Sequence, residues 1–377
     1  MRKLLLFSIF LLVAHFICGQ TIYEEIDSKK MGDTRRIKIQ LPRNYEKNKD
    51  KRYPIVLVFD ADYLFEPVAG NVDYLSYWED IPEAIVVGIM QGANRHTDCA
   101  YDDQHFMPGG TGAKFFEFIG MELLPYVDKK YRTAKFIIAV GHDVSANFIN
   151  YYLFKNPVLF NGYIVLSPDL APTLDQRIAA RLPEVKQKTF YYIATGSEDI
   201  PKLRDDAEAL HARLAALTSD NFHYYFDSFP DASHYTLVSR GIPNALEKIF
   251  SVYRPITKKE FSEVLMTTKT PMYDFLTEKY AIIKNLFGLD DKIRINDFLA
   301  VGTAAEKRKE WDELEKIGKL AQKQYPEKLI GDYYLGRSYE ENGNIKKAVH
   351  TYRNSFGKEE VDFITVDLLL DRADALK

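Results

Sequence analysis

The stretch that decides the fold is Phe136-Ile-Ile-Ala-Val-Gly-His-Asp-Val-Ser-Ala-Asn-Phe148. An apolar run leads into small residues around Asp143, and a segment compatible with a helix follows. When a strand turns sharply into a helix, the residue at the tip is strained, and the residues two positions away must be small. Gly141 and Ser145 meet this requirement on either side of Asp143. The pattern predicts a nucleophile elbow, G-x-Nuc-x-G, with Asp143 in the nucleophile position.

A second register of the same motif would place Ser145 at the tip. Asp143 and Asn147 would then occupy the crowded positions, and Ser145 itself would lie inside the helix. Because neither crowded position would hold a small residue, we expect Asp143 at the tip.

Strand-like and helix-like segments alternate from Ile22 to Tyr253. Short apolar runs are typical of strands that are covered on both faces. Strands interleaved with helices indicate a mostly parallel sheet with helices on both sides. The sequence therefore predicts an α/β fold, doubly wound around such a sheet. The segments expected to be strands are Arg36–Leu41, Tyr53–Phe59, Ala84–Ile89, Lys135–Val140, Gly162–Leu166, Phe190–Ala194 and His223–Phe229.

Motifs spread from Ser28 to Phe250, about three-fifths of the chain, together resemble the Putative esterase family. This family includes esterase D-like and enterochelin esterase-like proteins. The resemblance implies an α/β-hydrolase fold and carboxylic-ester hydrolysis. The matching motifs are Leu41-Pro-Arg-Asn-Tyr45, Tyr53–Asp60, Val86–Ile89, Asn94-Arg95 with Asp98, Gly109–Phe115, Glu122–Asp128 with Tyr131–Thr133, Gly141-His142 and Ser167-Pro168.

The chain departs from the family at the nucleophile. The family carries serine after Gly-His, usually followed by a paired glycine, whereas this chain reads Gly141-His-Asp-Val-Ser-Ala146. The family's Leu-Asp-Gly, whose backbone helps line the oxyanion hole, appears as Phe59-Asp-Ala61. The resemblance thus implies an oxyanion hole built from the backbone of Ala61 and Val144.

The resemblance also implies the other catalytic residues. In this fold the acid follows the nucleophile along the chain, and the histidine comes last. Thr195-Gly-Ser-Glu-Asp199 follows a strand-like run and offers Asp199, or alternatively Glu198, as the acid. His234 lies where the family places its histidine, and imidazole suits proton transfer near neutral pH. The residues expected to line the substrate pocket are His142, Asn94, Arg95 and Tyr63.

Asp143 leaves two functional hypotheses open. A carboxylate is a poor nucleophile toward an ester, but it can displace a leaving group from saturated carbon, and histidine-activated water then cleaves the alkyl-enzyme ester. Gly-His-Asp resembles the elbows of haloalkane dehalogenases and epoxide hydrolases, which use this route. In the first hypothesis the protein hydrolyses a small ester or alkyl substrate, with Asp143 as nucleophile or water-positioning carboxylate. In the second, an inactive esterase homologue binds a small-molecule ligand or a protein partner.

The C-terminal part, residues 255–377, reads as a separate helical domain after a hydrolase domain at residues 20–254. Several residues fall at the offsets of a tetratricopeptide repeat, with a degenerate copy one period earlier. About two such repeats are expected, and they form either a surface for a protein partner or a cap on the hydrolase domain. The residues at these offsets are Leu335, Gly336, Tyr339, Gly343, Ala348 and Tyr352, and in the earlier copy Gly302, Ala321 and Pro326.

Residues 1–19 read as a signal peptide, because basic Arg2 and Lys3 precede the apolar run Leu4–Ile17. We expect an exported protein, periplasmic or extracellular, with no membrane span after signal removal. The formal net charge of −4 and the absence of a basic domain give nucleic-acid binding no support. No cofactor is indicated. The acidic and histidine residues from His96 to His105 match no metal-ligand spacing, so we expect no metal site.

Overall fold

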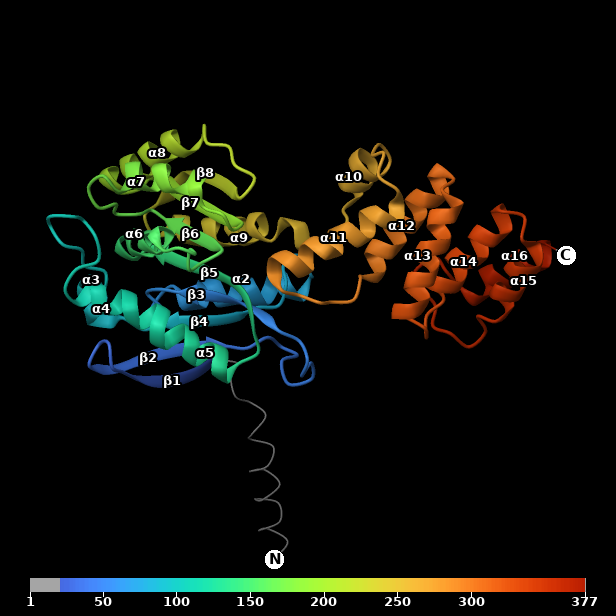
Figure 1. Cartoon of the computed structure of the whole chain (residues 1–377), viewed down its shortest axis with the longest axis horizontal. Coiled ribbons are helices and arrows are strands. Elements are labelled where there is room, and N and C mark those ends of the chain that lie inside the picture. Colours follow the sequence, from blue (N-terminus) through green and yellow to red (C-terminus); the bar gives the residue numbers. More distant parts are fainter. Residues whose placement is uncertain (1–20, 377) are drawn as a thin grey trace, which may run out of the picture. The chain divides into compact units, whose positions relative to one another are not determined.

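The computed structural model describes residues 21–376, so the expected signal peptide lies outside the described residues. The chain forms two compact units that divide between Ser251 and Val252. The first unit is built around an eight-stranded sheet with the order β1-β2-β4-β3-β5-β6-β7-β8 (Figure 1). The strands are β1 (Thr21–Ser28), β2 (Asp33–Gln40), β3 (Tyr53–Val58), β4 (Ile85–Ile89), β5 (Thr133–His142), β6 (Gly162–Leu166), β7 (Thr189–Glu198) and β8 (Phe222–Ser233).

The sheet is mostly parallel, as the sequence predicts. All neighbouring strands from β4 through β3 to β8 run parallel, whereas β1 pairs antiparallel with β2, and β2 pairs antiparallel with β4. The carboxyl ends of β3, β5, β6, β7 and β8 therefore meet at one edge, where ligands bind in open α/β sheets.

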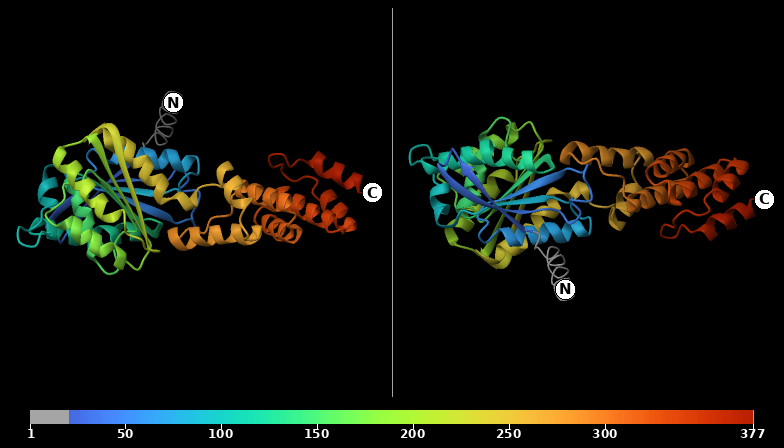
Figure 2. Two further views of the ribbon diagram at one scale, coloured as in Figure 1. Left: turned by 90° about the horizontal axis from the view of Figure 1, so that it is seen from above. Right: turned by 90° about the horizontal axis from the view of Figure 1, so that it is seen from below.

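Helices cover both faces of the sheet, and the strand residues alternate between these faces. All six residues of β3 are buried; Ile55 and Leu57 share one apolar cluster with helices α4 to α8. Figure 2 shows α2 and α9, which contact each other, on the opposite face. The helices are α2 (Phe65–Tyr77), α3 (Arg95–Asp98), α4 (Thr111–Phe118), α5 (Leu124–Lys130), α6 (Val144–Ile149), α7 (Leu174–Arg181), α8 (Pro201–Leu214) and α9 (Thr236–Ile249).

The second unit is all helical, as the sequence predicts, and its successive helices from α11 to α16 contact one another. Gly336 on α14 faces the ring of Tyr352 on α15: an added Cβ would lie 2.1 Å from Cε1 of that ring. Gly302 on α12 likewise faces Tyr334. These glycines permit close helix crossing, whereas the assignment as tetratricopeptide repeats stays a prediction. The helices are α10 (Lys258–Glu260), α11 (Met272–Phe287), α12 (Ile295–Arg308), α13 (Trp311–Gln324), α14 (Ile330–Glu341), α15 (Ile345–Arg353) and α16 (Val366–Ala375).

Across residues 21–376, no helix is both long enough and apolar enough to cross a bilayer. Across the same residues, no group of three or more histidine, cysteine, aspartate or glutamate side chains is arranged to hold a metal ion.

Candidate active site

Asp143 lies at the tip of a sharp turn between β5 and α6. Its backbone angles are φ 61° and ψ −122°, a conformation that few non-glycine residues adopt and that often marks an active site. A Cβ added to Gly141 would lie 2.7 Å from the backbone of Ser145 and Ala146. The turn therefore needs glycine at position 141, and it holds residue 143 at the carboxyl edge of the sheet.

Ser145 lies inside α6, and its hydroxyl is part of the support for the turn. Its Oγ donates to Asp60 Oδ2 at 2.6 Å and accepts the backbone N–H of His142 at 3.0 Å. Both groups are buried, with Ser145 fully inaccessible and Asp60 2% exposed. The hydroxyl of Ser145 thus ties the elbow to the end of β3.

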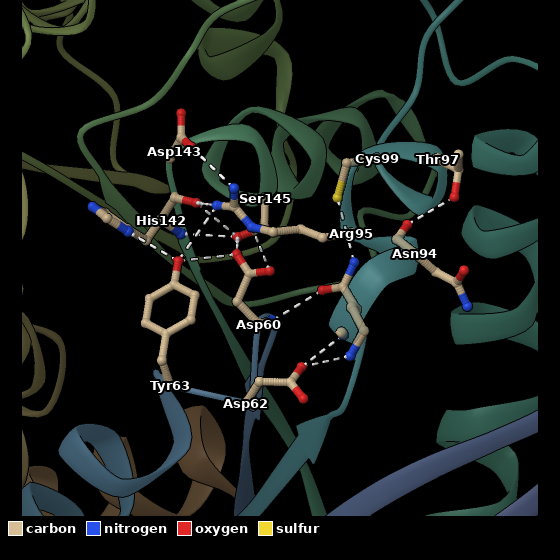
Figure 3. Close-up of polar contacts among 12 residues, drawn as sticks. Asp60, Asp62, Tyr63, Asn94, Arg95, Thr97, Cys99, His142, Asp143 and Ser145 are labelled. Carbon is tan, nitrogen blue, oxygen red and sulfur yellow. Dashed lines mark hydrogen bonds and ion pairs between the residues drawn. The ribbon is translucent and has the colours of Figure 1, made fainter.

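Arg95 connects two carboxylates in the site (Figure 3). Its Nε lies 2.8 Å from Asp60 Oδ1, and its Nη1 lies 3.1 Å from Asp143 Oδ2. Nη2 donates to the backbone carbonyl of His142 at 3.0 Å. Burial alone would lower the pKa of Arg95, but the hydrogen bond and charge of Asp60 raise it above its ordinary value. Arg95 therefore carries a permanent charge that compensates the Asp143 carboxylate.

His142, the residue before the tip, is a neutral, buried imidazole. Its Nε2 lies 3.0 Å from the carbonyl oxygen of His234, which can only accept, so Nε2 carries the proton. Its Nδ1 then accepts from the hydroxyl of Tyr63 at 3.0 Å. Burial, followed by the neighbouring charge of His234, lowers the pKa of His142 to about 4. Burial also raises the pKa of Tyr63, so both groups are neutral at pH 7.

His234 is paired with Asp199 at the ends of β8 and β7. Its Nδ1 lies 2.9 Å from Asp199 Oδ1 and 3.0 Å from Ser167 Oγ. Burial would raise the pKa of Asp199, but hydrogen bonds from His234, Ser167 and Thr195 hold it below its ordinary value. Asp199 is thus an ionised partner that orients the imidazole, whereas Glu198 is exposed.

The pairing at Nδ1 leaves Nε2 as the ring atom available for chemistry. Among the hydrogen bonds of residues 21–376, none joins His234 to Asp143, and the Asp143 carboxylate is bound by Arg95 instead. The two histidine rings, His142 and His234, lie side by side with centroids 4.3 Å apart. The structure therefore brings the elbow and the His234–Asp199 pair into one site through His142.

The two backbone donors expected in the oxyanion hole differ in their availability. The N–H of Ala61 donates to the carbonyl of Ile89 at 3.0 Å, so it is already committed within the sheet edge. Val144 is the first residue of α6, and the N–H groups of a first helical turn have no partner inside the helix. The expected role of Ala61 in the oxyanion hole stays a prediction, and Val144 offers an N–H that has no partner inside the helix.

Asn94 and Tyr63, also expected in the pocket, lie on opposite sides of Arg95 in Figure 3. Tyr63 takes part in the site through His142 and Asp60, whereas Asn94 is exposed on a short 3₁₀ turn, Gly92–Asn94. Sequence reasoning did not assign roles to Asp60 and Ser167. Both are polar residues within two positions of the end of a buried strand, and this is the signal that could have pointed to them.

Comparisons with known proteins agree with this fold. The family model described as "Putative esterase" matches residues 28–234. An uncharacterised protein from Capnocytophaga ochracea is 30% identical, with a TM-score of 0.84 over 95% of this chain and 99% of that chain. An IroE-like serine hydrolase from Shewanella oneidensis is 19% identical, with a TM-score of 0.61 over 80% of this chain and 99% of its own. The BES protein from Bacillus cereus is 22% identical, with a TM-score of 0.55 over 62% and 96%. No curated protein sequence matches the chain.

Proposed function

Because the chain belongs to the Putative esterase family, we propose that its first unit hydrolyses a small ester with water as the direct nucleophile. In this proposal His234 is the general base, Asp199 orients it, and Asp143 positions the attacking water. The observation that carries the proposal is the buried His234–Asp199 pair, which leaves Nε2 uncommitted beside the elbow.

The reaction needs the substrate, a water molecule and the groups that the site contains. A water oxygen attacks the ester carbonyl carbon while its proton passes to His234 Nε2, and the negative charge of Asp199 stabilises the imidazolium. The carbonyl oxygen becomes an oxyanion, and the N–H of Val144 is the donor that the elbow offers to it. The carbon–oxygen bond to the leaving group then breaks, and His234 returns the proton to the departing alcohol.

Arg95 favours this role of Asp143 over a covalent one. A carboxylate whose charge is compensated by a guanidinium 3.1 Å away is a weaker nucleophile than a free one, because its lone pairs are already shared. The same compensation lessens the repulsion between Asp143 and a developing oxyanion. A carboxylate can still hold a water molecule through its second oxygen.

The test is hydrolysis of 4-nitrophenyl acetate and 4-nitrophenyl butyrate in water enriched in oxygen-18, with wild-type enzyme and the His234→Ala variant. Direct attack places the label in the product acid and none in the tryptic peptide that contains Asp143. Label in that peptide would show a covalent intermediate on Asp143 and overturn the water mechanism. Equal rates for wild type and His234→Ala would remove His234 as the base.

A second candidate function is ligand binding without turnover. It is favoured by the ion pair that occupies Asp143 and by the commitment of the Ala61 N–H to Ile89. In that case the wild-type protein hydrolyses esters, epoxides and haloalkanes no faster than the His234→Ala variant does.

Compartment and partners are separate proposals. The basic and apolar order of residues 1–19 supports export to the periplasm or the exterior. The helical second unit supports a protein partner, since stacked helical repeats commonly provide such surfaces. Cell fractionation tests the first proposal, and affinity capture with the full-length protein tests the second.

A further inference from the structure

A cavity of about 460 Å³ lies next to the elbow, on the side of the sheet edge where β6 and β7 end. Its walls come from the loop after β6 and the start of α7, from α8 and from Tyr101. None of the residues assigned above to the reaction lines this cavity, so it is a feature in addition to the catalytic groups.

The loop after β6 connects the cavity to the catalytic groups. Asp169, a wall residue, donates its backbone N–H to the carbonyl of Asp143 at 3.3 Å. Ser167, two residues earlier, lies 3.0 Å from His234 Nδ1. Ala171, another wall residue, is fixed to α6 by the side chain of Asn147 at 2.8 Å. A substrate that reaches the elbow can therefore extend into this cavity.

The charged wall residues define the ligand chemistry. Three carboxylates, Asp169, Asp175 and Asp206, line the cavity, and Lys202 is the one cation among its lining residues. Lys202 Nζ lies 2.5 Å from Asp169 and 2.9 Å from Asp206, so these two carboxylates are spaced to share a single ammonium group. The Lys202 side chain is 62% exposed, and exposed ion pairs contribute little stability, so a ligand can displace it at small cost.

Apart from Thr173, the uncharged wall residues are mainly apolar. Leu170, Ala171, Pro172 and Ala209, with the ring of Tyr101, supply surface for an aliphatic stem. An aliphatic chain that ends in a cation fits both the apolar and the acidic part of the lining. Lysine and arginine side chains elsewhere in proteins likewise bury an aliphatic stem against apolar surface and keep the charged end in a polar environment.

We propose that this cavity is the subsite for a positively charged substrate group, an alkylammonium or guanidinium on a short aliphatic stem. Asp169 and Asp206 bind the cation in place of Lys202, and the apolar wall holds the stem. This assignment rests on the proposed function for its connection to catalysis, but binding can be measured without turnover.

Three matched probes test the subsite: the methyl esters of N-acetyl-lysine and N-acetyl-norleucine, and the α-methyl ester of N-acetyl-glutamate. They differ in the side-chain charge, which is positive, absent and negative. Binding is measured by calorimetry in the full-length His234→Ala protein, where turnover does not interfere. We expect the lysine ester to bind roughly tenfold more tightly than the norleucine ester, which corresponds to about 1.4 kcal/mol, and the glutamate ester to bind least.

Variants of α8 assign the effect to the cavity. Asp206→Asn, in the same background, should remove most of the preference for the lysine ester, and Lys202→Met should increase it because both carboxylates become free. The control is Asp205→Asn, which changes the neighbouring exposed carboxylate that pairs with Arg204 and should leave the preference unchanged. A preference for the glutamate ester that Lys202→Met abolishes, or equal binding of all three probes, would overturn the proposal.

The outcomes separate the subsite from the reaction. Charge-selective binding that depends on Asp206, without hydrolysis of any probe by the wild type, would support the subsite and reject the proposed reaction. Hydrolysis of all three esters with equal kcat/KM and no charge preference in binding would support the reaction and reject the subsite.

Discussion

Arg95 and Asp143 form an ion pair at 3.1 Å at the tip of the turn between β5 and α6. The buried Asp60 in turn holds Arg95 in place through a second ion pair. Asp60 also accepts the hydroxyl of Ser145, which lies two residues after Asp143. The carboxylate at the nucleophile position is therefore part of a network that includes the end of β3, the start of α3 and the first turn of α6. A negative charge at the tip is stable here because this network supplies its counter-charge.

Replacing Arg95 with glutamine should destabilise the first unit by roughly 2–4 kcal/mol, because the 2%-exposed Asp60 loses its charged partner. The measurement is the free energy of unfolding of the full-length protein in urea at pH 7. Arg43→Gln is the matched control: Arg43 pairs with Asp73 at a more exposed site, so less than about 1 kcal/mol is expected there. Adding Asp143→Asn to Arg95→Gln should restore part of the loss, and an equal effect of Arg95→Gln and Arg43→Gln would contradict the network.

Replacing Asp143 with serine should create a site that reacts with a fluorophosphonate probe, whereas the wild type stays unlabelled. A hydroxyl at the strained tip is activated if the Nε2 of His234 is within reach. Intact mass and peptide mapping measure the adduct. Adding His234→Ala should slow labelling by about a hundredfold or more. A folded Asp143→Ser protein that remains unlabelled would mean that the imidazole does not reach the tip.

The central strands of the sheet could be predicted from the sequence. They are buried on both faces and therefore form uninterrupted apolar runs in the sequence. Gly162–Leu166 is expected and observed with the same bounds. The edge strand β1 was not expected, because Thr-Ile-Tyr-Glu-Glu-Ile-Asp-Ser exposes residues on both faces and carries a weak apolar pattern. The backbone pairing of β1 with β2 makes this segment a strand, although its side-chain pattern does not predict one.

The position of a site residue could be predicted from the sequence only where the order of the strands along the chain determines it. Asp143, Asp199 and His234 each follow a strand of the parallel part of the sheet, so their arrival at one edge of the sheet could be expected. The partner of Asp143 could not, because Arg95 lies 48 residues earlier, on a four-residue helix whose placement depends on the loop after β4. The commitment of the Ala61 N–H to Ile89 likewise depends on how this edge closes, and no residue pattern encodes it.

His142 should make the protein less stable in mild acid. Its pKa is about 4 in the folded protein and near 6.5 when unfolded, so between these values the unfolded chain binds the extra proton. Stability should therefore fall as the pH decreases from 6.5 to 4, by roughly 3 kcal/mol in all from this group. The measurement is urea unfolding at pH 7, 5.5 and 4.5.

The His142→Gln variant isolates this effect, because its stability should decline less over the same pH range. Asp98, whose pKa burial raises to about 6, contributes equally to both proteins and cancels in the difference. His96→Gln, at an exposed position, should keep the wild-type slope. Parallel curves for wild type and His142→Gln would mean that His142 accepts a proton in the folded protein as readily as in the unfolded chain.

Replacing Gly336 with alanine should destabilise the second unit, although alanine is the better helix former. The added Cβ would lie 2.1 Å from the ring of Tyr352, which is fully buried and hydrogen-bonded to Glu340 at 2.7 Å, so the ring must move. Overpacking of this kind costs about 1–3 kcal/mol and outweighs the gain of roughly 1 kcal/mol in helix propensity. Hydrogen exchange of peptides from α14 and α15 in the full-length protein measures the change.

Two further variants show whether the close approach of these helices is the cause. Gly70→Ala on α2, where an added Cβ meets nothing within 4 Å, should protect its helix by up to about 1 kcal/mol instead. Tyr352→Leu combined with Gly336→Ala should exchange more slowly than the sum of the two single changes predicts, because the smaller side chain leaves room for the methyl group. If Gly336→Ala by itself slows exchange in α14, the two helices can separate without loss, and the small residue at this crossing would not be required by packing.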